Sequence, residues 1–322
     1  MPQRAKIETL KQGMRLPLIG APMFLASGVD LVVAQCCAGV IGTFPALNAR
    51  PASALSNWLR EIETRLAIYR EATRSAPAAY GVNLIVNAYN ERLEEDLATI
   101  VRHKVPLVIT SLSSPDRVVE AVHGYGGVVF HDVIKARHAR KAVAAGVDGL
   151  ILVSAGAGGH AGTLSPFALI EEVRAFYDGP LALSGAIANG RAILAAEALG
   201  CDFAYAGTVF IPTEEAMSPK EHKGMILAAE ADDILYTPMF SGTHANYLSA
   251  SITRAGVDLE EARQAAPRRM TDKSDPDRPK AWKDVWSAGQ AVSQSREVQP
   301  TARLIAKLEK DYRAALKALC KG

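Results

Sequence analysis

The chain has 322 residues, of which 49% are hydrophobic and 22% are charged, and its formal net charge is +2. This length and composition are typical of a soluble globular protein with one barrel-sized domain and an appendage. The balanced charge, with no Lys/Arg cluster among aromatic residues, excludes the electrostatic pattern of a nucleic-acid-binding protein.

The amino-terminal residues and the spacing of the cysteines indicate in which cellular compartment we expect the protein. Residues 1–15 are polar and charged, and no apolar run approaches about 18 residues, so we expect neither a signal peptide nor a membrane span. The cysteines lack CxxC spacing, which argues against a zinc site or a disulfide framework and predicts small buried core residues in a reducing cytoplasm. They are Cys36, Cys37, Cys201 and Cys320.

Short apolar runs alternate with amphipathic helical segments along the first two-thirds of the chain. Each run is almost continuously apolar, as in strands of a parallel sheet that is covered on both faces. We therefore predict an α/β fold, a closed (β/α)₈ barrel, with an open doubly wound sheet as the alternative. The predicted strands are 16–21, 39–43, 81–86, 107–111, 128–132, 150–153, 181–185 and 203–207.

The pattern changes after Phe210, where prolines interrupt the chain. We expect residues 1–212 to form the barrel and residues 213–300 a smaller, mainly helical cap that contributes to the substrate region. The stretch 268–280 is polar and proline-containing, which predicts an exposed loop. Apolar residues at helical spacing in 301–319 predict a final helix that packs back on the barrel.

A glycine-dense segment with one histidine follows the sixth predicted strand. It reads Ser154-Ala155-Gly156-Ala157-Gly158-Gly159-His160-Ala161-Gly162. Glycines permit positive φ and a close approach of the backbone to a ligand, and imidazole transfers protons near neutral pH. This composition predicts an active-site loop.

Two further small-residue turns follow the seventh and eighth predicted strands, at 184–190 and 206–208. In (β/α)₈ barrels the active site lies at the carboxyl ends of the strands, and loops after strands seven and eight often bind phosphate through backbone amides. The two turns therefore predict a phosphorylated cofactor or substrate.

Several of these segments together resemble the nitronate monooxygenase family, formerly called 2-nitropropane dioxygenases. The resemblance covers nearly the whole chain, and its most specific part is the GGHxG loop. The matching segments are Gly20-Ala21-Pro22-Met23, Gly81-Val82-Asn83, Ala157-Gly158-Gly159-His160-Ala161-Gly162, Ser184-Gly185-Ala186-Ile187, Ala206-Gly207-Thr208 and Trp286-Ser287-Ala288-Gly289-Gln290.

The resemblance implies a TIM-barrel flavoprotein that holds FMN and oxidises small alkyl nitronates with O2, an oxidoreductase of the monooxygenase type. It implies that His160 is the catalytic base, since removal of a proton beside a nitro group needs a base that titrates near neutrality. The implied flavin contacts are Ala21, Pro22, Met23, Asn83, His131, Gly158, Gly159, Ser184, Gly185, Ala186, Ala206, Gly207 and Thr208.

Other positions complete the predicted site. His244 and Gln290 are candidates for the substrate pocket, and we expect no metal site. Some relatives carry a Lys after the fifth strand, where this chain has Asp132, so we expect Asp132 to point away or to pair with Lys135 or another cation. Trp282 and Trp286, four residues apart, are expected to pack as one helix face.

The sequence leaves several alternatives open. The second is an NAD(P)H-dependent reductase of quinones or enoyl thioesters in the same superfamily, and the third is a flavin-free, phosphate-binding isomerase or lyase. A flavin-binding protein without catalysis is the fourth. The expected partners are a small-molecule substrate and O2, without nucleic acid or membrane, and use of NAD(P)H and formation of a homodimer stay open.

Overall fold

A computed structural model describes residues 2–267 and 279–320 of the chain. Its main feature is a sheet of eight parallel strands in the order β1-β9-β8-β6-β5-β4-β3-β2. The strands are β1 (Leu18–Gly20), β2 (Gly42–Pro45), β3 (Tyr80–Val86), β4 (Leu107–Leu112), β5 (Val128–Val133), β6 (Gly149–Val153), β8 (Leu181–Ser184) and β9 (Phe203–Ala206).

The sheet closes on itself between its first and last members. Ile41, directly before β2, bridges Ile19 of β1 in parallel register. The Gly20 amide donates to the Ile41 carbonyl at 2.8 Å, and the Ile41 amide donates to the Leu18 carbonyl at 3.1 Å. All eight predicted strands are present, the prediction of a (β/α)₈ barrel is confirmed, and the open doubly wound sheet is excluded.

Side chains alternate between the inside and the outside of the barrel, as the pleat of a strand requires. On β5, Phe130 lies in the apolar cluster that fills the barrel, whereas Val129 and Val133 lie in the cluster shared with the surrounding helices. On β9, Phe203 and Tyr205 face inward. This alternation decides which residues at the strand ends face the barrel mouth.

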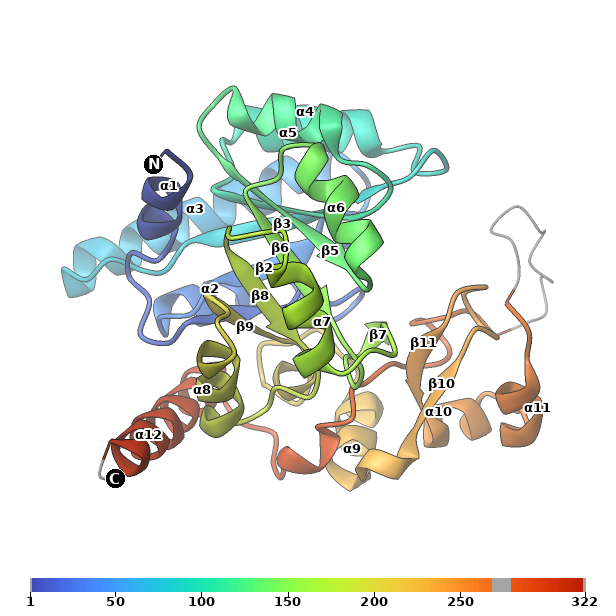
Figure 1. The fold of residues 1–322 in the computed structure, drawn as a ribbon. Helices are drawn as coiled ribbons and strands as arrows, with labels where there is room; N and C mark the ends of the chain where they lie inside the picture. Colours follow the sequence, from blue (N-terminus) through green and yellow to red (C-terminus); the bar gives the residue numbers. More distant parts are fainter. Residues whose placement is uncertain (1, 268–278, 321–322) are drawn as a thin grey trace.

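Helices cover the outside of the barrel and one of its ends (Figure 1). The residues Ile7 and Leu10 of α1 are buried in the same cluster as Phe203, so α1 covers the amino ends of the strands. The carboxyl ends remain for the site. The helices are α1 (Pro2–Leu10), α2 (Val29–Cys37), α3 (Ala54–Thr73), α4 (Leu93–Arg102), α5 (Asp116–His123), α6 (Ala136–Ala144), α7 (Pro166–Arg174), α8 (Gly190–Ala198) and α12 (Thr301–Leu319).

The segment between the barrel and α12 contains helices and, unexpectedly, a small sheet. The strands β10 (Ile234–Thr237) and β11 (Ala245–Leu248) pair antiparallel, and β11 also pairs with β7 (Gly159–His160) of the glycine loop. The sequence did not predict this sheet. The remaining elements are α9 (Lys220–Ala228), α10 (Ser249–Arg254), α11 (Leu259–Gln264) and the 3₁₀ turns η1 (Ala46–Asn48), η2 (Thr208–Phe210), η3 (Ala231–Asp233) and η4 (Val292–Gln294).

The predicted cap contains the helices α9, α10 and α11 beside the small sheet, and its extent, with the division at residues 212 and 213, stays a proposal. The predicted loop at 268–280 lies, except for its last two residues, outside the described residues. Cys36 and Cys201 are buried as predicted, but Cys320 is exposed at the end of α12, so the prediction was wrong for that cysteine. Within the described ranges, no helix combines the length and apolarity needed to cross a bilayer.

The last helix packs against α8 and α2 on the outside of the barrel (Figure 1). The contact is closest at Gly190, the first residue of α8. A Cβ atom there would lie 2.0 Å from the backbone nitrogen of Tyr312 and 2.6 Å from the carbonyl oxygen of Leu308. Only glycine fits at this contact between the two helices.

Replacing Gly190 by Ala therefore tests the packing of α12. We expect Gly190→Ala to lower the free energy of unfolding by about 1–3 kcal/mol, because backbone atoms must move to admit the methyl group. The matched control is Gly224→Ala in α9, where a Cβ would meet no atom within 4 Å. There alanine should be neutral or stabilising by up to about 1 kcal/mol. Urea denaturation of both variants measures the difference, and equal effects would contradict the packing.

Candidate active site

Three polar side chains meet at the carboxyl ends of β3, β4 and β5, on the inner face of the barrel. The Asn83 amide Nδ2 donates to the Ile109 carbonyl at 3.1 Å and to Ser111 Oγ at 2.8 Å. Ser111 Oγ donates to Asp132 Oδ2 at 2.6 Å. The side chains thus form one hydrogen-bonded chain across neighbouring strand ends.

Asp132 faces inward and makes no ion pair with any described residue, so the expectation that it points away or pairs with Lys135 was wrong. Its Oδ1 atom is inaccessible to solvent and has no hydrogen-bond partner within the described part of the chain. Burial raises the pKa of Asp132 to about 6, although the hydrogen bond from Ser111 opposes this rise. Burial raises the pKa of Tyr205, which faces the same interior, and the charge of Asp132 adds to this rise.

His131, the neighbour of Asp132, faces the outside of the barrel. Its side chain is buried, and Nδ1 lies 2.8 Å from Thr110 Oγ1 on β4. Burial lowers the pKa of His131 to about 4, so the ring is neutral at physiological pH. Asp132, the next residue, faces the interior instead, and a contact between His131 and a flavin stays a prediction.

The glycine loop is anchored by the cap. His160 pairs with Ala245 and Gly159 with Asn246, so the loop forms the edge strand of the small sheet. The Asn246 side chain donates from Nδ2 to the Ala157 carbonyl at 2.7 Å. A later segment of the chain contacts the other side of the glycine loop, because the backbone amide of Gln290 donates to the Gly156 carbonyl at 2.9 Å.

The environment of His160 fixes the position of its proton. Ser241 Oγ donates its single hydrogen to the Thr243 carbonyl at 2.8 Å and lies 3.0 Å from His160 Nε2. With this hydrogen on the Thr243 carbonyl, Ser241 accepts a hydrogen bond from Nε2–H, and this assignment leaves the lone pair of the neutral ring on Nδ1. Solvent reaches the ring, yet enough protein surrounds it that desolvation lowers the pKa of His160 below its ordinary value of 6.5.

Aromatic side chains surround the other side of this imidazole. The Trp282 ring meets the His160 ring edge to face, with centroids 5.1 Å apart, and also contacts the rings of Phe24 and Tyr247. Trp282 lies in no helix and has a positive φ of 63°. The predicted helix face with Trp286 was therefore wrong, because Trp286 instead stacks on His222.

The turn after β8 presents backbone donors. Gly185 and Ala186 have positive φ values of 143° and 53°. The amides of Ala186, Ile187, Ala188 and Asn189 donate to no acceptor in residues 2–267 and 279–320. A run of unpaired amides directly before a helix is suited to an oxyanion such as phosphate.

The turn after β9 lies beside the turn after β1. A Cβ at Gly207 would be 3.4 Å from both Ala21 Cβ and Met23 Sδ. The Ala21 amide donates to the Ala206 carbonyl at 2.8 Å, and Thr208 Oγ1 accepts a hydrogen bond from the Gly289 amide at 2.8 Å. The turns after the first and last barrel strands therefore form one continuous rim with the segment that ends at Gln290.

Four more of the predicted flavin contacts, Pro22, Gly158, Gly159 and Ser184, differ in burial and in the space around them. Ser184 is buried at the end of β8, where its carbonyl accepts from Ser154 Oγ at 2.7 Å. At Gly158 a Cβ would lie 2.9 Å from the Gly289 amide nitrogen, whereas Gly159 has open space. The turn residue Pro22 is half-buried.

The two candidates for the substrate pocket lie on different sides of the loop. His244 is half-exposed and stacks on Tyr236, with ring centroids 4.9 Å apart, while Tyr236 Oη donates to the Ala161 carbonyl at 2.8 Å. The Gln290 side chain is exposed and lies over Gly156, where a Cβ would be 3.0 Å from its Oε1. Within the described residues, neither side chain makes a hydrogen bond or a ring contact with His160.

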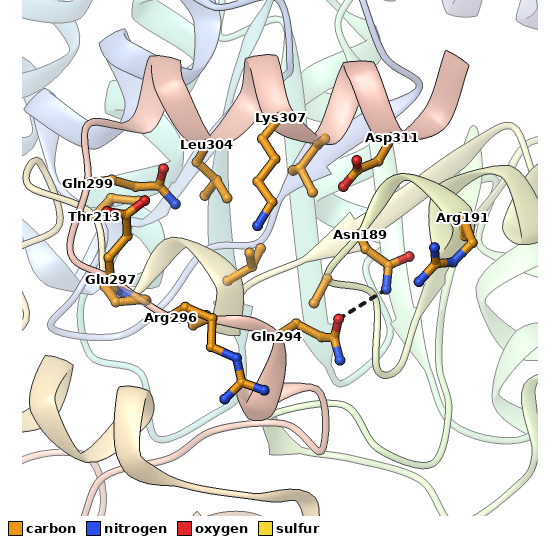
Figure 2. A pocket seen from close by; sticks show the side chains of 15 residues that line it. Asn189, Arg191, Thr213, Gln294, Arg296, Glu297, Gln299, Leu304, Lys307 and Asp311 are labelled. Atoms are coloured by element: carbon orange, nitrogen blue, oxygen red, sulfur yellow. Dashed lines mark hydrogen bonds between the residues drawn. The ribbon is translucent and has the colours of Figure 1, made fainter. Parts of the chain in front are cut away.

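A polar cavity of about 110 Å³ lies on the flank of the barrel, between α8, η4 and α12 (Figure 2). Ala188 and Asn189 of the turn after β8 line it, whereas His160 and the predicted flavin contacts do not. Arg191, Arg296 and Lys307 lie around it together with the carboxylates of Glu297 and Asp311, so the lining favours neither anionic nor cationic ligands. The described ranges also hold no group of three His, Cys, Asp or Glu side chains arranged for a metal ion.

The family model described as nitronate monooxygenase matches residues 23–311, which includes every loop of this rim from Met23 onward. The chain belongs to the nitronate monooxygenase family. The resemblance inferred from the sequence is confirmed, and membership supports a flavin-dependent oxidoreductase.

Three relatives illustrate the range of this similarity. A protein of Mycobacterium tuberculosis named as a monooxygenase is 33% identical over 55% of this chain and 46% of its own length. An octahydro-1H-indene-4-carboxyl-CoA dehydrogenase of Rhodococcus jostii is 25% identical over 76% of this chain and 65% of its own. A nitronate monooxygenase of Neurospora crassa is 24% identical over 94% of this chain and 90% of its own.

A solved structure shows the same fold. The nitroalkane oxidase of Streptomyces ansochromogenes is 23% identical, covers 98% of this chain and 99% of its own, and superposes with a TM-score of 0.81. Among the three relatives named above, the Mycobacterium tuberculosis protein is matched over only about half of its own length.

The tautomer of His160 generates a prediction. We expect Nε2 to carry the hydrogen in the neutral ring of the wild-type protein, and Ser241→Ala to produce a mixture of both tautomers and to lower the pKa of His160 further. The reason is that the serine oxygen stabilises both Nε2–H and the imidazolium. Long-range ¹H–¹⁵N correlation spectra measure both quantities. A neutral wild-type ring protonated at Nδ1 would contradict the assignment.

Proposed function

We propose that this protein is an FMN-dependent oxidoreductase of the nitronate monooxygenase type, which oxidises small nitroalkanes or alkyl nitronates with O2 and uses His160 as the catalytic base. The observation that carries the proposal is the placement of His160. It is a neutral imidazole on a glycine loop, held at one nitrogen by Ser241 and bearing a lone pair on the other.

The residues at the rim fit a phosphorylated flavin. The unpaired amides of residues 186–189 and the turn at Gly207 are suited to the phosphate. Asn83 uses both hydrogens of its amide nitrogen within the barrel, which leaves Oδ1 to accept from an N–H of the ring. The orphaned Oδ1 of Asp132 faces the same interior and needs a partner. When bound, the flavin supplies the electron-accepting chemistry.

The chain's own contribution to the reaction is proton transfer. Nδ1 of His160 takes the proton from the carbon beside the nitro group, and the C–H electron pair remains as the nitronate. Ser241 continues to accept from Nε2–H and thereby stabilises the imidazolium that forms. Trp282 holds the ring plane by its edge-to-face contact and excludes water from that side.

The Rhodococcus relative favours a second candidate function, in which the substrate is a CoA thioester. On this reading the same barrel and flavin act as an NAD(P)H-dependent reductase or as a dehydrogenase of acyl thioesters. His160 would still exchange a proton with a carbon beside a carbonyl group, because a nitro group and a thioester carbonyl both make the C–H bond beside them acidic.

Replacing the imidazole separates proton transfer from oxidation. We expect His160→Asn to retain FMN and to lose about 100-fold or more in the rate of flavin bleaching by a neutral nitroalkane without oxygen, because the base is removed. A preformed nitronate needs no base and should lose far less. The wild-type rate with nitroalkane should fall as the pH drops through the pKa of His160, which lies below 6.5. Stopped-flow absorbance measures both.

The matched control is His138→Asn, a histidine on the outer helix α6, which should leave the ratio of the two rates unchanged. Equal losses for nitroalkane and nitronate in His160→Asn would contradict the base assignment. Fast bleaching of the wild-type protein by NAD(P)H or by an acyl-CoA, with slow bleaching by both nitro compounds, would favour the second candidate.

A further inference from the structure

The polar chain at the ends of β3, β4 and β5 has one direction. Asn83 donates the two hydrogens of its side-chain amide to the Ile109 carbonyl and to Ser111 Oγ. This pairing fixes the orientation of the amide, because its oxygen could not donate in place of Nδ2. Ser111 then spends its single hydrogen on Asp132 Oδ2. The hydrogen bonds that link the three side chains therefore all run from Asn83 through Ser111 to Asp132.

The chain ends on an atom without a partner. Asp132 Oδ1 is inaccessible to solvent, and neither a donor nor a cation among the described residues contacts it. An ionised carboxylate there would be a buried charge with a single hydrogen bond, which is costly. The raised pKa of Asp132, about 6, has this cause.

A neutral Asp132 places its proton at a defined atom. Oδ2 accepts the hydrogen bond from Ser111, so the acid hydrogen belongs on Oδ1. Oδ1–H then presents a donor on the inner face of the barrel. The free acceptor Oδ1 of Asn83 faces the same interior from β3, two strands away across β4. The pair offers one donor and one acceptor, a pattern that complements the carbonyl oxygens and single N–H along the pyrimidine edge of a flavin.

We propose that Asp132 is a neutral carboxylic acid in the FMN complex and donates a hydrogen bond from Oδ1 to an acceptor atom of the isoalloxazine ring. The inference rests on the proposed function, because it requires a flavin in the barrel mouth. It assigns Asp132 a role as a positioning residue, with Ser111 holding the orientation of its carboxyl group.

The test is flavin affinity against pH. Wild type and Asp132→Asn are titrated with FMN and with riboflavin, which lacks a phosphate that itself titrates near pH 6. Asparagine keeps an acceptor for Ser111 and puts a non-titrating donor in place of Oδ1–H. Since flavin binds the protonated form, wild-type affinity for riboflavin is full at low pH and falls as the pH rises through the carboxyl pKa of the apoprotein. We expect a fall of about tenfold, the effect of one pKa unit, and a flat profile for Asp132→Asn.

Two further variants show that the effect belongs to this carboxyl group. Ser111→Ala removes the donor that stabilises the anion, so the fall in affinity should move to higher pH, which a general structural defect would not do. Asp178→Asn removes an exposed carboxylate before β8, at the opposite end of the barrel, and should leave the wild-type profile unchanged.

The outcomes separate the two proposals. Binding of riboflavin with parallel pH profiles in wild type and Asp132→Asn would overturn the role of Asp132 and leave the proposed function intact. Failure of the wild-type protein to bind either flavin would overturn the proposed function and this inference with it.

Discussion

The pairing of β7 with β11 is the interaction on which the arrangement of the site depends. β7 consists of two residues of the glycine loop, and its backbone is the edge strand of a sheet that the cap supplies. Without this pairing the glycines would leave the loop many conformations, since they restrict the backbone least. The cap therefore sets the position of His160 relative to the barrel.

The same dependence explains the electrostatics around the imidazole. Ser241 lies in the segment between β10 and β11, so the residue that contacts His160 Nε2 comes from the same small sheet that holds the loop. Trp282 brings a third segment to the ring. A change in the cap thus acts on His160 directly, although the barrel supplies the turns suited to a flavin.

The barrel was predictable from the sequence because its strands are short, almost continuously apolar and separated by helical segments. The cap sheet was not, since two residues of a glycine loop carry no strand pattern and their partner lies some 85 residues further along the chain. For the same reason Ser241 and Trp282 were missed as neighbours of His160. The inward position of Asp132 could have been predicted, because the apolar Phe130 two residues earlier faces the interior and alternation places His131 on the opposite face.

The central claim is that His160 removes a proton from the substrate before a bound flavin accepts electrons. The most direct measurement is the deuterium isotope effect on anaerobic flavin bleaching, with a nitroalkane deuterated at the carbon beside the nitro group. We predict a primary isotope effect for the nitroalkane in the wild-type protein and none for the nitronate prepared beforehand from either isotopologue. The account would be contradicted if the nitroalkane bleached the flavin at a rate independent of deuterium and His160→Asn were bleached as fast as the wild-type protein.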